Sequence, residues 1–185
     1  HAGISGWSSY PKEVKEAVKL DGQAKLHANE SVAVIHVAGP NFRRRKGATA
    51  DEALTDLRTA YRATLDEFAS SAQRVLRMPP LGSGLYQGHM GKELPWLTAQ
   101  ALTMAFLDLA EDTLDLLLGK EVQVCIFRED EHEHFEQAMI RDKALNDEQR
   151  EEARVLAQEL EVGKPVRDLE NRRGYLLTPV FFTFF

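Results

Sequence analysis

Short apolar runs alternate along the chain with longer segments whose apolar residues recur every three or four positions. The short runs predict strands at residues 24–28, 31–37, 75–78 and 122–127. The longer segments predict helices at residues 11–19, 51–69, 94–118 and 131–143. Strands that alternate with helices are typical of an α/β protein whose sheet is covered on both faces.

The ends of these helices carry recognisable signals. Pro11 suits the first helical position of the first segment, and Thr49 or Asp51 can cap the second. The segment 94–118 is apolar around most of its circumference, so we expect one buried helix that Gly119 ends.

The composition changes after Ala144. Asn146 and Gln149 resemble a capping box before a charged helix over 147–160. The aromatic end, GYLLTPVFFTFF, has the character of a strand, but Pro179 argues against a central place in a sheet. We therefore expect one domain over 1–143 and a helical and aromatic extension over 144–185.

Composition narrows the classes of protein. The 185 residues are 43% hydrophobic and 28% charged, as in ordinary soluble domains, and no apolar run approaches the length of a membrane span. The start, HAGISGWSSY, lacks the charged and apolar regions of a signal peptide. We expect an intracellular protein, cytoplasmic or nuclear, with no membrane contact. The single cysteine, Cys125, excludes an internal disulfide and predicts a buried, unreactive thiol.

The net charge of −6 argues against a protein that coats nucleic acid, so no nucleic-acid partner is expected. The one basic cluster is residues 43–46, RRRK, before the second helix. It predicts a solvated loop, and contact with phosphate or RNA is the alternative.

The segment 77–88, RMPPLGSGLYQG, carries the clearest candidate chemistry. Gly82, Ser83 and Gly84 predict a turn between the end of a strand and the start of a helix. Such a turn directs backbone N–H groups to one point, and the helix behind it adds positive potential, so the turn can hold a phosphate. The alternative is a plain turn in which Tyr86 caps the core.

Several segments together resemble the macrodomain family. Residues 34–40 (VIHVAGP) resemble its strand ending in Gly-Pro, and residues 79–88 (PPLGSGLYQG) resemble its second phosphate loop. Residues 122–139 resemble its last strand and helix, and residues 22–26 (GQAKL) resemble a segment before the Gly-Pro strand. The start resembles the end of the family's first glycine loop, with Ala2 for one glycine and Trp7 for a small residue.

The resemblance spans about residues 1–140 and implies a three-layer α/β/α fold with a mixed sheet. It implies that ADP-ribose binds across the carboxyl ends of the strands, with its pyrophosphate between the two glycine loops and its adenine on Phe127. The alternative for Phe127 is a place in the core. The ligand-binding residues expected from the resemblance are Gly3, Ile4, Ser5, Gly6, Gly82, Ser83, Gly84, Leu85, Tyr86 and Phe127.

The chain departs from the family in ways that affect function. It lacks the aspartate that reads adenine and the Asn-Ala-Ala-Asn segment facing the distal ribose. Three explanations stay open: the chain is a fragment, the domain has lost those segments, or the aromatic C-terminal strand takes the place of the missing strands. Ser5 stands where hydrolytic members of one branch place an aspartate, and the Gln-Glu-Glu signature of another branch is absent. Catalytic residues are therefore unknown.

The main hypothesis is a reader that binds ADP-ribose or a mono-ADP-ribosylated protein. The alternatives are a hydrolase acting on ADP-ribosyl esters or on the terminal phosphate, and a degenerate macrodomain that serves as a structural subunit. No cofactor is expected, and a protein partner could contact the C-terminal extension.

The histidines receive structural interpretations. No metal site is expected at residues 131–134 (EHEH), because His132 and His134 lie two apart and do not share a helix face. We expect His36 to be a core histidine with a hydrogen-bonded partner. We expect His89 to be a loop residue, and contact with the ligand is the alternative.

Overall fold

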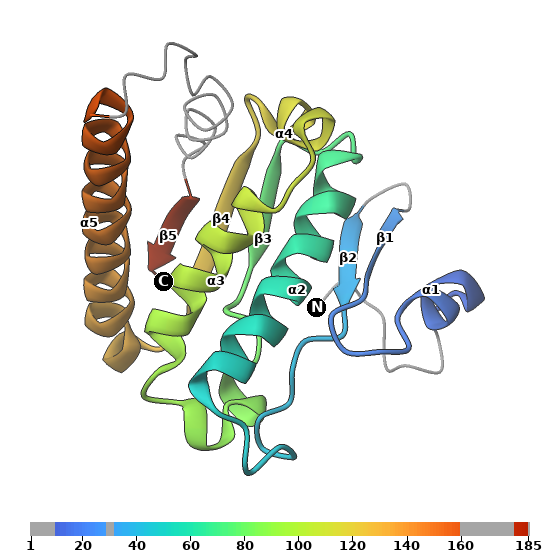
Figure 1. Ribbon diagram of the computed structural model, residues 1–185. Helices are drawn as coiled ribbons and strands as arrows, with labels where there is room; N and C mark the ends of the chain where they lie inside the picture. The colour runs from blue at the N-terminus through green and yellow to red at the C-terminus, as the bar shows by residue number, and fades with distance from the viewer. Residues whose placement is uncertain (1–9, 29–31, 160–179, 185) are drawn as a thin grey trace.

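The computed structural model describes residues 10–28, 32–159 and 180–184. Helices and strands alternate along most of this chain (Figure 1). The helices are α1 (Lys12–Ala17), α2 (Ala50–Ala69), α3 (Leu94–Leu107), α4 (Glu111–Leu117) and α5 (Glu129–Glu159). The strands are β1 (Ala24–Ala28), β2 (Ala33–Val37), β3 (Val75–Met78), β4 (Glu121–Ile126) and β5 (Val180–Phe184). The predicted α/β class is confirmed.

The described strands form two small sheets. β1 and β2 are antiparallel, with Leu26 opposite Ile35, whereas β3, β4 and β5 are parallel in that order. The sequence predicts one sheet containing residues 34–37, 75–77 and 122–126. That expectation is wrong for the first of these segments, because β2 pairs with β1 and not with β3. Apolar periodicity identifies a strand but not its partner.

The aromatic C-terminal strand lies at a sheet edge, as Pro179 predicts. β5 pairs with β4 from Val122 opposite Val180 to Ile126 opposite Phe184, on the side of β4 away from β3. It therefore occupies the edge of β4, and it does not lie between β2 and β3.

The predicted division of the chain into helices is wrong in two places. The segment 94–118 forms two helices, because the chain turns at residues 108–110. At this turn Asp108 pairs with the Arg58 guanidinium of α2, and Leu109 is buried. In contrast, α5 continues through residues 144–146, where the sequence predicts a break between two helices. The division of the chain into a domain and an extension stays a prediction.

Helix α2 is held at both ends by polar contacts. Thr49 and Glu52 form a capping box at its start, with the Thr49 N–H donating to Glu52 Oε2 over 2.8 Å. Near its end, Lys120 Nζ donates to the carbonyls of Phe68, Ala69 and Ser71 at 3.0, 2.8 and 2.7 Å. Carbonyls at the end of a helix lack N–H donors from a following turn, and the Lys120 ammonium supplies hydrogen bonds to them instead.

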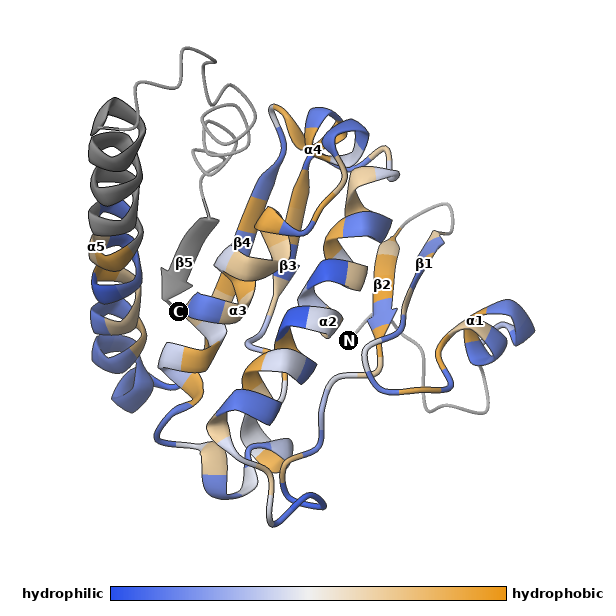
Figure 2. Ribbon diagram, in the orientation of Figure 1, coloured by the Kyte–Doolittle hydropathy of each residue, from blue (hydrophilic) through white to orange (hydrophobic). Residues whose placement is uncertain are grey.

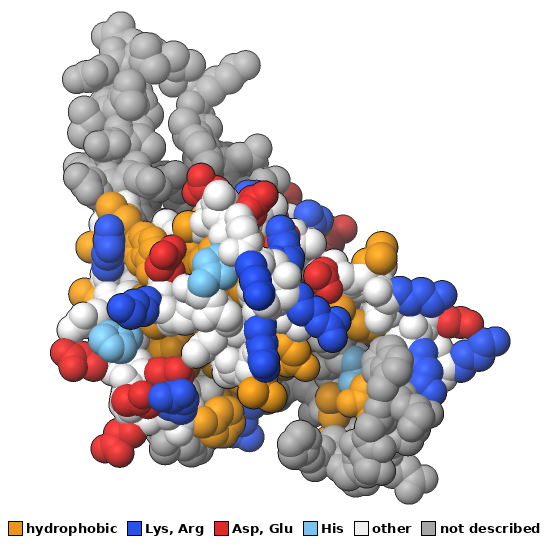
Figure 3. All heavy atoms as spheres, turned by 90° about the horizontal axis from the view of Figure 1, so that it is seen from below, with side chains coloured by type: hydrophobic (Ala, Val, Ile, Leu, Met, Phe, Trp, Pro, Cys, Tyr) orange, Lys and Arg blue, Asp and Glu red, His pale blue; other side chains and the backbone are white. Residues whose placement is uncertain are grey.

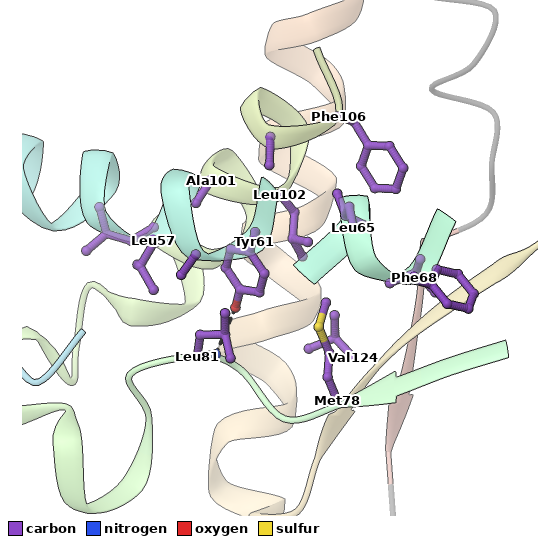
Figure 4. Packing of buried hydrophobic residues seen from close by; sticks show 14 of the residues in the cluster. Leu57, Tyr61, Leu65, Phe68, Met78, Leu81, Ala101, Leu102, Phe106 and Val124 are labelled. Carbon is purple, nitrogen blue, oxygen red and sulfur yellow. Dashed lines mark hydrogen bonds between the residues drawn. The ribbon is translucent and has the colours of Figure 1, made fainter. Parts of the chain in front are cut away.

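The core lies between α2, α3 and the β3–β4 pair (Figure 4). Leu57, Tyr61 and Leu65 project from α2 at helical spacing, and they pack with residues of α3 and with Met78 and Val124 of the two strands. Apolar residues concentrate on these surfaces, whereas the outer side of α2 is hydrophilic (Figure 2). The sheet is therefore held by helix faces that the sequence periodicity predicts.

Cys125 is buried in β4, at 5% exposure, as predicted. Burial raises the pKa of its thiol. A thiol that is both covered and protonated is a poor nucleophile, which agrees with the structural interpretation.

Candidate functional site

The loops after β2 and β3 contact each other at one edge of the molecule, and β4 ends at the same edge. β3 and β4 are parallel, so their carboxyl ends share this edge, and β2 ends at the same lower edge in Figure 1. Residues 38–49 follow β2, and residues 79–93 follow β3. In open α/β folds, ligands bind outside the carboxyl ends of the strands. This edge is therefore the place to look for a site.

Residues 79–88, here the glycine loop, rest on one buried aromatic ring. Phe42 follows β2 and is fully buried. A Cβ on Gly82 would lie 2.8 Å from Phe42 Cε2, and a Cβ on Gly88 would lie 2.6 Å from the Phe42 carbonyl oxygen. Both glycines also have positive φ, +72° and +52°. The base of the loop therefore requires glycine at both positions.

A hydrogen bond from the core fixes the start of the same loop. The Leu81 N–H donates to Tyr61 Oη over 2.9 Å (Figure 4). Tyr61 is fully buried on α2, and burial raises its pKa to about 12. The phenol is therefore neutral at physiological pH.

The tip of the glycine loop is open. Gly84, Leu85 and Tyr86 form a 3₁₀ turn, and they are exposed, Leu85 at 78% and Tyr86 at 55%. A Cβ on Gly84 would meet nothing within 4 Å. The alternative in which Tyr86 caps the core is therefore wrong. The N–H groups that begin a helical turn have no acceptor within it, so the amides of Gly84 and Leu85 suit an anion.

The expected helix directly behind this turn is absent from the structure. A second 3₁₀ turn, Gly88–Met90, follows the first, and α3 begins only at Leu94. The expectation of a helix start behind the glycines is therefore wrong, because the positive φ of Gly84 and Gly88 turns the chain before α3 begins. Any anion contact at the tip comes from loop amides and not from a helix terminus.

Phe127 follows β4 at the same edge and is 68% exposed. A place in the core, the alternative for Phe127, is therefore wrong. Its neighbour Ile126 is buried at 1% exposure, so the chain leaves the core between these two residues. Most of the Phe127 side chain therefore lies on the surface at this edge.

The basic cluster lies directly against the glycine loop. The Arg43 N–H donates to the Tyr86 carbonyl over 3.2 Å, and His89 Nε2 lies 2.9 Å from the Ala48 carbonyl oxygen. Figure 3 shows Lys and Arg side chains gathered near the middle of this face. The sequence predicts a solvated loop at residues 43–46, and the structure places this loop against the loop at 79–88. Residues 40–48 are called the basic loop below.

The remaining residues singled out from the sequence are the first glycine loop and two histidines. Gly3, Ile4, Ser5 and Gly6 lie outside the described residues. His36 is only half-buried, and its Nε2 has no hydrogen-bond partner within the described chain, so the expected partner is not found at this nitrogen. Its ring packs 4.4 Å from that of Tyr10, and burial, with His27 nearby, lowers its pKa. His89 contacts a loop carbonyl, in agreement with its interpretation as a loop residue.

Among the described residues, no group of three or more His, Cys, Asp or Glu side chains is arranged to hold a metal ion. His132 Nε2 lies 3.2 Å from the Ile126 carbonyl oxygen. Asp130 pairs with Arg128, which lowers the pKa of the carboxyl.

Phe42 is the functional-site residue that sequence reasoning missed. An aromatic residue two positions after the Gly-Pro end of a strand was the available signal.

A comparison with protein families now adds to this geometry. The family model described as Macro domain matches residues 8–93. Over this segment the chain is similar to the macrodomain family. The match contains the basic loop and the glycine loop and ends before β4. Members of the family generally bind ADP-ribose.

Two further comparisons, with curated proteins and with solved structures, found no match. Among the described helices, none is long and apolar enough to cross a membrane.

Proposed function

We propose that this chain is a reader that binds ADP-ribose, free or attached to a protein, at the carboxyl edge of its strands. The observation that supports this most directly is the contrast within the glycine loop. Gly84, at the open tip, has no neighbour within 4 Å of an added Cβ, although the loop base is locked on Phe42. A rigid loop with an accessible amide tip is suited to a ligand phosphate.

In this proposal the pyrophosphate contacts the amides of residues 83–86, and Gly3–Gly6 supply the opposing loop. Tyr86 lies against a ribose, and Phe127 stacks on the adenine. Hydrogen bonds from amides to a charged phosphate contribute roughly 1.5–3 kcal/mol each, and base stacking adds roughly 1–3 kcal/mol. These terms are enough for binding without a lysine at the tip.

Binding is proposed in preference to hydrolysis because of Ser5. A hydroxyl there cannot act as the general base that an aspartate would supply. The structural-subunit alternative needs a closed site, and the exposure of Leu85 and Tyr86 favours an open one.

The test is calorimetric titration of the whole chain with ADP-ribose, using Gly84→Asp and Gly84→Asn. Gly84 has φ +61°, and Asp and Asn are the residues that best tolerate this conformation. The two variants have nearly the same shape, so they differ chiefly in charge. Losing two phosphate contacts predicts an affinity loss of at least about a hundredfold for Asp. Asn should lose much less.

If the folded wild type does not bind ADP-ribose at millimolar concentration, the reader proposal is wrong and the structural-subunit alternative remains. Equal affinity of the folded Asp and Asn variants would show that the phosphate does not approach Gly84.

A further inference from the structure

The basic loop presents three cations beside the proposed ADP-ribose site. Arg43, Arg44 and Lys46 are exposed, whereas Arg45 is occupied by an ion pair with Asp56. The nearby Glu52 accepts hydrogen bonds from Thr49, so this carboxylate is engaged in the helix cap. The three exposed side chains form no ion pair within the described part of the chain.

The backbone of this loop is fixed relative to the glycine loop. The Arg43 amide bonds to the Tyr86 carbonyl, the Phe42 ring fills the space against Gly82, and Ala48 contacts His89. Because both ends of the basic loop are tied, its cations stay next to the tip of the glycine loop.

In Figure 1, β4, β3 and β2 lie in this order from left to right, and the loops that follow them indicate which end of the ligand meets these cations. ADP-ribose is a linear molecule of adenine, ribose, pyrophosphate and distal ribose. With adenine at Phe127 after β4, and pyrophosphate at the glycine loop after β3, the distal end points toward the loop after β2. That loop is the basic loop, and the distal ribose is where a modified protein is attached.

We propose that Arg43, Arg44 and Lys46 bind acidic side chains that flank an ADP-ribosylated residue in the partner protein. This inference rests on the proposed function and adds the class of partner sequence that the same site selects. A peptide fits better than a nucleic acid. The cations occupy one short loop of a chain with net charge −6, whereas nucleic-acid binders carry extended basic stripes.

The test compares three ligands by calorimetry at low salt: free ADP-ribose, a peptide ADP-ribosylated on one serine between glutamates, and the same peptide with glutamines. Exposed ion pairs contribute about 0.2–1 kcal/mol each, so we expect the glutamate peptide to bind about tenfold tighter than the glutamine peptide. Salt above about 0.5 M should remove most of this preference, because it shortens the screening length.

The test variant is Arg43→Gln/Arg44→Gln/Lys46→Gln, which should lose the preference for the glutamate peptide. The matched control is Lys19→Gln/Arg74→Gln/Lys143→Gln. It removes the same charge from exposed positions outside both loops, and Arg74 precedes β3, at the opposite end of that strand from the glycine loop. This control should keep the preference.

The outcomes separate the two proposals. If free ADP-ribose does not bind, the proposed function fails. If free ADP-ribose binds but the two peptides bind equally, only the acidic-partner inference fails. If the control variant also loses the preference, the preference depends on the net charge of the protein and not on the basic loop, and the acidic-partner inference fails. Tighter binding of a single-stranded RNA than of the glutamate peptide would assign the basic loop to nucleic acid instead.

Discussion

The base and the tip of the glycine loop obey different constraints, although they are only a few residues apart. At the base, Gly82 and Gly88 have positive φ and no room for a Cβ beside Phe42. At the tip, Gly84 has the same kind of backbone angle but open space around it. The base glycines are therefore needed for packing, whereas the tip glycine leaves an amide surface exposed.

The comparison shows that a glycine-rich motif does not have one role. At Gly82 and Gly88 a side chain would collide with Phe42 or Arg43. At Gly84 a side chain would meet no neighbour, and only the backbone angle would be unfavourable. Changes at the base should therefore lower stability first, and changes at the tip should lower affinity with little effect on stability.

The largest effect is expected for Gly88→Ala. Its Cβ would lie 2.6 Å from the Phe42 carbonyl oxygen and 2.7 Å from the Arg43 nitrogen, and both are backbone atoms that cannot move aside easily. Strain and clash together predict a loss of about 3 kcal/mol or more in the free energy of unfolding. Urea denaturation followed by circular dichroism measures it.

Gly47→Ala is the matched control, because a Cβ there meets nothing within 4 Å. It should change the free energy of unfolding by less than about 0.5 kcal/mol. Equal stability of the two variants would mean that the loop base is not locked.

A smaller loss is expected for Tyr61→Phe. The buried Leu81 N–H would lose its acceptor, which predicts a cost of about 1–3 kcal/mol in the free energy of unfolding. Because folding raises the pKa of Tyr61 to about 12, its contribution is fully present below the unfolded value of about 10 and is lost as the pH rises toward 12.

The measurement is urea denaturation of both proteins at about pH 8 and about pH 11, on either side of the unfolded pKa. The wild type should lose more stability than the variant between these pH values. A wild type and variant with parallel pH dependence would contradict the role of the buried phenol.

Much of the fold could be predicted from the sequence, because strands and helices leave a local periodicity. The predicted strand at 24–28 agrees with β1, and the helix at 51–69 begins one residue later than α2. The break at Asp108 could not be predicted, since it depends on an ion pair with Arg58, fifty positions earlier. The separation of β2 from β3 likewise depends on which strand pairs with which.

The candidate site could be predicted only in part. The motif around Gly84 indicates an anion loop, but only the structure separates its tip from its base. The position of Arg43 beside Tyr86 depends on the packing of Phe42 against Gly82, a contact between segments forty residues apart in sequence. No local pattern encodes that distance, so the basic cluster could be predicted as a loop but not as a neighbour of the site.

At the exposed edge, Phe127→Ala should lower affinity without unfolding the protein. Loss of stacking, roughly 1–3 kcal/mol per base, predicts about a tenfold or greater loss of affinity for ADP-ribose. Ribose 5-phosphate has no adenine, so its affinity should be unchanged in the variant. Phe127→Tyr, which keeps an aromatic ring, should bind ADP-ribose nearly as well as the wild type. An equal loss for both ligands in Phe127→Ala would place the adenine elsewhere.

The smallest effect on stability is expected for Leu85→Ser. Leu85 is 78% exposed at the tip, whereas Leu81 at the start of the same loop is 7% exposed and belongs to the core. Leu85→Ser should therefore change the free energy of unfolding by less than about 0.5 kcal/mol, and Leu81→Ala should cost about 2–5 kcal/mol. Chemical denaturation of the two variants under one set of conditions tests the contrast. A large loss in Leu85→Ser would mean that the tip is packed in solution, and it would remove the open amide surface on which the ADP-ribose site depends.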